Sequence, residues 1–214
     1  MICIPCGSFT GAIQMQDPYV QVQKVDVAER QADLQFSVSL NNRDQRTRQC
    51  GIVAVKYEVN DATNSRNAEF QLFQRFVLAP GATSVSVAFG TEHVLDAQLW
   101  YPHTHGTPTL YNATFAVVVD PCETTNTTGS SVQESENLAA VFNELLPGAL
   151  NDEADFQFGI RKVEPIVNSA LGGLEFLVND ERVFLNGGNW IASDQLMRFA
   201  ADYDRALAEV AFHR

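Results

Sequence analysis

The residues with the clearest potential for chemistry stand near the C-terminal end, in the segment 184–194, Phe-Leu-Asn-Gly-Gly-Asn-Trp-Ile-Ala-Ser-Asp. An apolar run leads into paired glycines, then into Asn189 and Trp190, and then into a polar turn that reaches Asp194. The glycines carry no Cβ, so the backbone there can approach a ligand closely. The pattern predicts a strand end that presents side chains to a bound molecule.

Two other groupings of reactive residues give weaker signals. His103 and His105 form an HxH pair without an evident third ligand, so an exposed loop is the simpler interpretation and a metal site the alternative. Cys3 and Cys6 form a CxxC at the start of the chain, where chance spacing competes with a redox site or half a zinc site. We therefore predict no metal site and no cofactor.

Two sequons for N-glycosylation begin at Asn112 and Asn126. Asn112 falls on the polar face of a predicted strand whose other face is apolar, which favours exposure of this sequon. Both asparagines are candidate acceptors if the protein is secretory, and chance occurrence is the alternative.

Length and composition exclude several classes of function. The chain has 214 residues, of which 45% are apolar, enough for one or two globular domains. Its net charge of −12 argues against a nucleic acid or an anionic membrane as partner, since both attract Lys and Arg. No apolar run is long enough to span a bilayer, and the N-terminal residues do not resemble a signal peptide. The compartment is not assigned.

The acidic residues concentrate in the middle of the chain. Between Val77 and Ile160 there is no Lys or Arg, whereas Asp and Glu occur 10 times. A solvated acidic surface explains this bias best, because the carboxylates do not have the spacing of a cation-binding loop.

Residues 19–119 alternate between apolar and polar side chains, the period of strands with one buried face. The alternation is clearest over 32–40, 53–59, 70–78, 85–89 and 111–119, with turn residues between these runs. This pattern predicts an antiparallel β-sandwich of immunoglobulin-like architecture, although the chain has no Cys–Trp–Cys framework.

Residues 121–153 interrupt the rhythm and read as a surface insertion. Leu138, Val141, Phe142 and Leu145 have the spacing of an amphipathic helix, which Pro147-Gly148 is expected to end. Packing of this helix on the sandwich is the simpler interpretation, and binding of a partner is the alternative.

Alternation returns from Phe156 and predicts a last sandwich strand that runs through Val163. A hairpin follows, with arms at 174–178 and 182–185 around Asn179-Asp180-Glu181. A helix is expected over 202–213. Strand, loop and helix together make one βα unit, of which a parallel barrel contains eight.

Several of these segments resemble family 2 glycoside hydrolases at the junction between an immunoglobulin-like sandwich and a catalytic (β/α)8 barrel. The matching segments are 158–164, 176–184, 187–194 and Leu99-Trp100-Tyr101-Pro102, where Tyr101 replaces the usual second tryptophan. The best match is to the β-mannosidase branch, which includes mannosylglycoprotein endo-β-mannosidases and exo-β-glucosaminidases. The resemblance covers roughly residues 10–120 and 156–214.

The resemblance implies a fragment of a mainly β protein with three parts. Residues 1–18 are expected to be a linker from a missing N-terminal domain. Residues 19–165 form the sandwich with its acidic insertion 121–153, and 166–214 start a truncated barrel. The incomplete barrel should leave residues 174–214 poorly packed.

The resemblance also implies a retaining mechanism with two glutamates, a proton donor and a nucleophile. Both belong to later barrel strands, so no catalytic residue is expected in this chain and the chain alone should be inactive. Glu164, Glu175 and Glu209 are assigned to structure or solvent.

The resemblance further implies that this chain holds the edge of the sugar pocket. There Trp190 would stack on a sugar ring, Asp194 would accept hydrogen bonds, and Asn189 would be a third substrate-binding residue. Core packing of Trp190 and a turn or cap role for Asp194 are the alternatives. The expected partner of the complete protein is a β-mannoside-type glycan. The competing hypothesis is a non-catalytic sandwich module that supports neighbouring domains or binds carbohydrate weakly.

Overall fold

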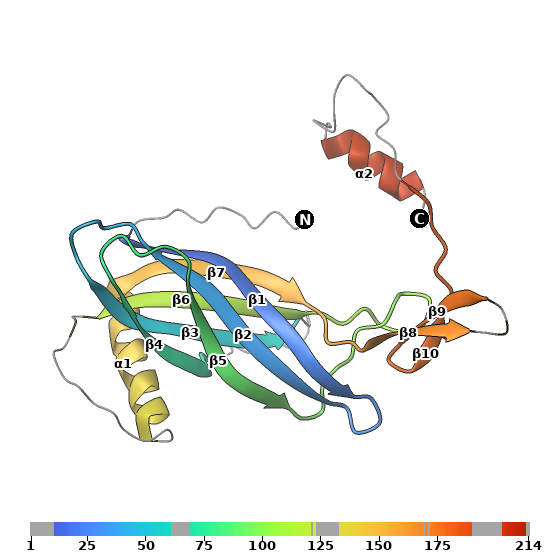
Figure 1. Cartoon of the computed structure of the whole chain (residues 1–214), viewed down its shortest axis with the longest axis horizontal. Coiled ribbons are helices and arrows are strands. Elements are labelled where there is room, and N and C mark those ends of the chain that lie inside the picture. The colour runs from blue at the N-terminus through green and yellow to red at the C-terminus, as the bar shows by residue number, and fades with distance from the viewer. Residues whose placement is uncertain are drawn as a thin grey trace. The chain divides into compact units, whose positions relative to one another are not determined.

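The computed structural model describes residues 11–60, 69–120, 122, 133–168, 170, 172–189 and 203–212. These residues divide into two compact units, one that ends at Val183 and one that begins at Phe184. The first unit holds a β-sandwich and a small additional sheet (Figure 1).

The sandwich consists of two antiparallel sheets. One has the order β1-β2-β5, with bounds Ile13–Asp26, Gln31–Asn42 and Val85–Val94. The other has the order β4-β3-β6-β7, with bounds Leu72–Leu78, Gln49–Val59, Tyr111–Asp120 and Leu150–Phe158. The antiparallel β architecture predicted from the alternating pattern is thus confirmed.

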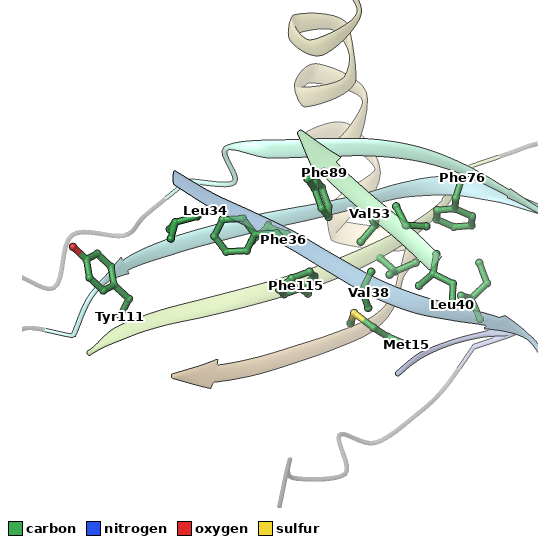
Figure 2. Close-up of a cluster of buried hydrophobic side chains, with 14 of the residues drawn as sticks. Met15, Leu34, Phe36, Val38, Leu40, Val53, Phe76, Phe89, Tyr111 and Phe115 are labelled. Carbon is green, nitrogen blue, oxygen red and sulfur yellow. The ribbon is translucent and has the colours of Figure 1, made fainter. Parts of the chain in front are cut away.

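The main core lies between the two sheets (Figure 2). On β2, every second residue from Ala32 to Leu40 is at most 3% exposed, whereas the residues between them point outward. Phe36 is at the centre: its ring stacks on Tyr57 at 5.3 Å and lies 6.2 Å from Phe115 of the opposite sheet. Burial of such large apolar side chains supplies most of the free energy that holds the two sheets together.

A second core covers the outer face of the four-stranded sheet. Helix α1 (Gln133–Ala149) places Phe142, fully buried, against Phe70 and Phe73, with ring centroids 4.9 and 5.5 Å apart. Ile52, Ala54, Ala116 and Val118 lie beneath it. The central strands β3 and β6 are therefore apolar on both faces, which explains their continuous apolar runs.

The helix of the insertion packs on the sandwich, which was the simpler of the two interpretations. Its predicted end at Pro147-Gly148 is wrong, because α1 continues to Ala149 and β7 follows at once. A proline disturbs the turn that precedes it. Pro147 lies in the last turn of α1, so the backbone hydrogen bond that a proline cannot donate is lost only at the end of the helix.

A disulfide joins Cys50 at the start of β3 to Cys122, just after β6, with the Cα atoms 5.1 Å apart. The strand register explains the pairing, because Cys50 stands opposite Asp120 in the antiparallel ladder and Cys122 follows two positions later. This register was not predictable from the sequence, so the two cysteines had no predicted partner.

The first strand starts before the predicted linker ends. β1 begins at Ile13, and Ile13 and Met15 belong to the main core with 0% and 9% exposure. The alternation then breaks at Asp17, whose φ of 49° accompanies a register shift between Gln16 and Tyr19. Such a bulge shifts the buried side of a strand, so the pattern before residue 19 was not recognisable as part of the same strand.

The small sheet has the order β10-β9-β8, with bounds Glu181–Val183, Gly173–Val178 and Val163–Asn168. The predicted last sandwich strand is present as β7, but its predicted extension to Val163 is wrong, because β7 ends at Phe158 and Val163 starts a different sheet. The hairpin is confirmed, with a shorter second arm. Asn179 and Asp180 form its turn with φ of 50° and 66°, the left-handed values that a two-residue type I′ turn requires.

The second unit contains residues 184–189, without regular secondary structure, and helix α2 (Tyr203–Phe212). The predicted helix over 202–213 is confirmed within these bounds. Phe184 and Leu185 are 87% and 64% exposed, and α2 has no buried residue. The described residues contain no strand after Val183, so the start of a barrel remains a prediction. Within the same residues, no helix has the length and apolar character to cross a membrane.

Candidate functional site

Three segments of the first unit meet beyond the ends of β5 and β7. The loop after β5 contacts residues 159–160, which follow β7. Leu99 and Ile160 form a parallel bridge, and Trp100 N donates a hydrogen bond to Ile160 O at 2.8 Å. The hairpin turn of β9 and β10 forms the third segment. We call this meeting of segments the junction.

Asn179 ties the three segments of the junction together. Its side chain is buried, with the residue 2% exposed, and its Nδ2 donates to Trp100 O at 2.9 Å. Its Oδ1 accepts from Lys162 N, and its own N donates to Lys162 O, both at 2.9 Å. Asparagine suits this position because it tolerates the left-handed backbone and offers both a donor and an acceptor.

Aromatic and charged contacts reinforce the junction. The Arg161 guanidinium lies 4.7 Å from the ring centroid of Trp100, a cation–π geometry. Gly159 lets the Trp100 side chain pack directly against the backbone, since a Cβ there would lie 2.9 Å from the Trp100 Cβ. Lys162 Nζ contacts Asp180 at 2.8 Å and Glu164 at 3.0 Å, and these carboxylates, chiefly Asp180, raise the pKa of the Lys162 ammonium.

A pocket of about 420 Å³ opens beside the junction, a volume typical of small-molecule sites. Its lining comes from the β1–β2 turn, from the loop after β5 and from the first residue of β10; it comprises Val27, Arg30, Gln98, Leu99, Tyr101, His105, Gly106, Thr107, Thr109 and Glu181. The lining combines hydrogen-bonding side chains with an aromatic ring and aliphatic groups. The pocket was not predicted from the sequence, because its walls come from segments far apart in the chain.

The wall of the pocket is held by contacts within the sandwich. Arg30 pairs with Asp96 at 3.1 Å, and Ala97 N donates to Arg30 O at 2.6 Å. The Tyr111 hydroxyl accepts from Gln98 N at 2.9 Å, and burial raises the pKa of Tyr111. The loop after β5 is therefore held at Ala97 and Gln98 by hydrogen bonds within the sandwich, without any ligand.

The predicted substrate-binding residues are not assembled by the described structure. Asn189 is exposed in the segment after β10, while Trp190 and Asp194 lie outside the described residues. Of the glycosylation candidates, Asn112 lies on β6, half-buried, where its Oδ1 accepts from Gln157 Nε2 at 2.9 Å, and Asn126 lies outside the described residues. These assignments stay predictions.

The remaining reactive residues have structural surroundings. Glu164 pairs with Lys162, Glu175 with Arg182 at 3.4 Å, and Glu209 with Arg205 at 3.1 Å. His105 Nδ1 lies 2.7 Å from Thr104 Oγ1, and His103 is exposed. Cys3 and Cys6 lie outside the described residues. Among the residues that the structure describes, no group of three or more His, Cys, Asp or Glu is arranged to hold a metal ion.

Comparison with known proteins gives this architecture a family. The model of a family described as glycosyl hydrolases family 2 matches residues 13–130, more than half of the chain. The chain belongs to this family. The match begins with the first residue of β1 and includes both sheets up to β6, so the family assignment rests on the sandwich.

A curated relative of this family 2 chain is a mannosylglycoprotein endo-β-mannosidase from Lilium longiflorum, 24% identical over 208 residues. The alignment covers 95% of this chain but 18% of the relative, so the chain spans about a fifth of the relative's length.

Solved structures share the fold. An exo-chitosanase from Amycolatopsis orientalis superposes with a TM-score of 0.58 at 20% identity, over 85% of this chain and 16% of the other. A β-D-mannosidase from Dictyoglomus thermophilum gives 0.51 at 18% identity, over 84% and 17%. At such identities the similarity shows the fold alone.

Proposed function

We propose that this chain is part of a retaining glycoside hydrolase that cleaves β-mannosides or related β-glycosides of glycans. The observation that carries the proposal is the alignment with the Lilium longiflorum endo-β-mannosidase over 95% of the chain, together with membership of family 2. The aligned length extends beyond the sandwich, so the similarity is not restricted to a module that many enzymes share.

We propose further that the chain does not catalyse hydrolysis by itself. Retaining hydrolysis needs two carboxyl groups about 5 Å apart on either side of the scissile bond. The pocket beside the junction is lined by one carboxylate, Glu181. Glu164, Glu175 and Glu209 are instead engaged in ion pairs with Lys162, Arg182 and Arg205.

The test compares the 214-residue chain with the protein encoded by the complete reading frame, on p-nitrophenyl β-mannoside and p-nitrophenyl β-glucosaminide. The complete protein should release nitrophenol, and proton NMR should show the β-anomer of the sugar as the first product. The 214-residue chain should release none. The proposal would be contradicted if the 214-residue chain hydrolysed a substrate, or if the complete protein hydrolysed no β-glycoside.

Asn189, Trp190 and Asp194 are proposed to contact the sugar in the complete enzyme. Trp190→Ala should then raise KM and lower kcat on the nitrophenyl substrate, because a lost stacking surface weakens both the bound substrate and the transition state. Trp100→Phe, in the junction, is the matched control and should leave both constants within about twofold. Equal effects of the two variants would indicate loss of folding instead.

The two sequons are proposed glycosylation acceptors. The Cys50–Cys122 disulfide favours this reading, since structural disulfides form mainly in oxidising compartments where glycosylation also occurs. Expression in a secretory eukaryotic host should give a mass increase that a glycosidase specific for N-glycans removes. Asn112→Gln and Asn126→Gln would show which acceptor is used, and an unmodified secreted chain would refute the proposal.

A second candidate function is a non-catalytic module that binds carbohydrate weakly. The specific observation in its favour is the pocket beside the junction, whose lining residues all belong to the first unit.

A further inference from the structure

The pocket beside the junction has a lining suited to one class of ligand. Within the described part of the chain, the side chains of Gln98, Thr107, Thr109 and Glu181 make no hydrogen bond or ion pair, so their polar groups are available to a ligand. Together they offer an amide, two hydroxyls and a carboxylate. This set of donors and acceptors matches the hydroxyl groups of a sugar ring.

The apolar part of the pocket supplies a complementary surface. Tyr101 is half-buried and lines the pocket with Val27 and Leu99. Gly106 lies directly against Tyr101, because a Cβ on this glycine would come within 3.0 Å of the Tyr101 Cβ and 3.1 Å of its Cγ. Glycine at this position therefore lets the loop pack closely against the tyrosine. The Tyr101 ring is the aromatic group of the lining, and aromatic rings stack on the C–H face of a pyranose.

The charges in the pocket argue against other ligands. The basic residues of the pocket's lining are Arg30 and His105. The Arg30 guanidinium is already paired with Asp96, and its Nε donates to Ala97 O at 3.5 Å. A phosphate or nucleotide would need free cationic groups. The carboxylate of Glu181 belongs to the lining and has no ion-pair partner among the described residues. A carboxylate can accept hydrogen bonds from the hydroxyl groups of a sugar or from an amino substituent on it.

The walls of the pocket are fixed before binding. Tyr101 N donates to Thr107 O at 3.1 Å, and Gly106 N donates to Pro102 O at 3.1 Å, which closes the loop. Glu181 follows directly after the Asn179-Asp180 turn, whose position the buried Asn179 sets through Trp100 O. A pre-formed site loses little conformational entropy on binding.

We propose that this pocket is an accessory binding site for one hexose unit of a β-linked glycan. The choice of a glycan as ligand rests on the proposed function, whereas the position of the site rests on the lining. Tyr101 stacks on the sugar ring, and Gln98, Thr107, Thr109 and Glu181 bind its hydroxyl groups. The lining residues belong to the sandwich and the β9–β10 hairpin, and none of them comes from the segment 184–194.

The experiment is a titration of the ¹⁵N-labelled 214-residue chain with β-1,4-mannobiose and, in parallel, with deacetylated chitobiose. We expect fast-exchange shift changes confined to the residues of the pocket, with a dissociation constant of about 1 mM or tighter. Tyr101→Ala should weaken binding at least about tenfold. Gln98→Ala, at an exposed position, should weaken it by a smaller factor without risk to folding.

Tyr19→Ala is the matched control, because Tyr19 is a tyrosine with 59% exposure on β1 and does not line the pocket. Its affinity should equal that of the unaltered chain. A preference for chitobiose would support the site and assign Glu181 to the amine of the sugar. Absence of shifts up to about 10 mM sugar, shifts outside the pocket, or affinities unchanged in Tyr101→Ala and Gln98→Ala would overturn the proposal.

These outcomes are independent of the test of hydrolysis. Binding is measured on a chain that is expected to be inactive, and hydrolysis is measured on the complete protein. Binding without hydrolysis would refute the enzymatic proposal and retain the site, whereas hydrolysis without binding would do the reverse.

Discussion

The sandwich and the small sheet β8–β10 are both antiparallel and belong to one compact unit, yet they differ in how far their apolar side chains are buried. In the sandwich, the alternating positions of β2 are almost completely buried, and even the outer face of β3 and β6 is covered by α1. In the small sheet, Val163, Val167 and Leu174 are 51%, 77% and 57% exposed. The strand register places these three side chains on one face.

The two regions are stabilised by different interactions. Apolar burial holds the sandwich, with two separate cores on the two faces of its four-stranded sheet. The small sheet buries little and is attached through directed polar contacts, above all those of Asn179. We expect substitutions in the first region to affect global unfolding and substitutions in the second to affect local opening.

The largest effect is expected from Phe36→Ala in the main core. This change removes a fully buried ring that contacts Tyr57 and Phe115, and should lower the free energy of unfolding by about 3–5 kcal/mol. Urea denaturation followed by circular dichroism measures it. Tyr19→Ala, at an exposed tyrosine, should stay within about 0.5 kcal/mol of the unaltered chain. Comparable losses in both variants would refute the proposed core.

A smaller loss is expected from Phe142→Ala in the second core. The ring is fully buried against Phe70 and Phe73, but α1 can shift or detach without dismantling the sandwich, so we expect up to about 3 kcal/mol. Glu144→Ala on the exposed side of the same helix is the control and should change little. A null effect of Phe142→Ala would mean that the outer face of the sheet is not sealed by α1.

A local effect is expected from Asn179→Ala. The substitution removes hydrogen bonds to Trp100 and Lys162 and introduces a residue that disfavours the left-handed backbone, with a cost of about 1–3 kcal/mol to the hairpin. Amide exchange over 173–183 should accelerate, while the midpoint of global unfolding should hardly move. Asn179→Gly keeps the backbone conformation and loses the side-chain bonds, so it separates the two causes.

The smallest effect concerns alkaline pH. Burial, followed by the nearby Glu92 carboxylate, raises the pKa of Tyr57, whose hydroxyl donates to Glu92 at 3.0 Å. The unfolded chain releases this proton near pH 10 while the folded chain retains it, so stability should fall as pH rises above about 10. Tyr57→Phe should show a shallower decline in thermal unfolding temperature between pH 9 and 11. Parallel declines in the two proteins would contradict the assignment.

The sequence was sufficient for the features that depend on local periodicity. The alternation from Ala32 to Leu40 predicted β2, and the spacing around Phe142 predicted α1. It was insufficient where the outcome depends on register or on distant segments. The Cys50–Cys122 pair follows from the alignment of β3 with β6, and the pocket joins Arg30, Tyr101 and Glu181 from three parts of the chain.

The junction illustrates the same limit at one residue. Asn179-Asp180 was recognisable as a hairpin turn, because both residues tolerate left-handed backbone. Nothing local indicates that the Asn179 side chain is buried and bridges Trp100 to Lys162, since both partners come from other segments. In the sequence, an asparagine whose side chain bridges two segments cannot be distinguished from an ordinary turn asparagine.

Hydrogen exchange followed by mass spectrometry on the 214-residue chain tests the central contrast most directly. We expect the amides of β3 and β6 to open only with global unfolding, those of β8–β10 to exchange on the order of a hundredfold faster, and those of 203–212 to exchange fastest. Exchange over 163–183 and 203–212 as slow as in β3 and β6 would contradict the account, because it would require apolar burial that the two regions do not have.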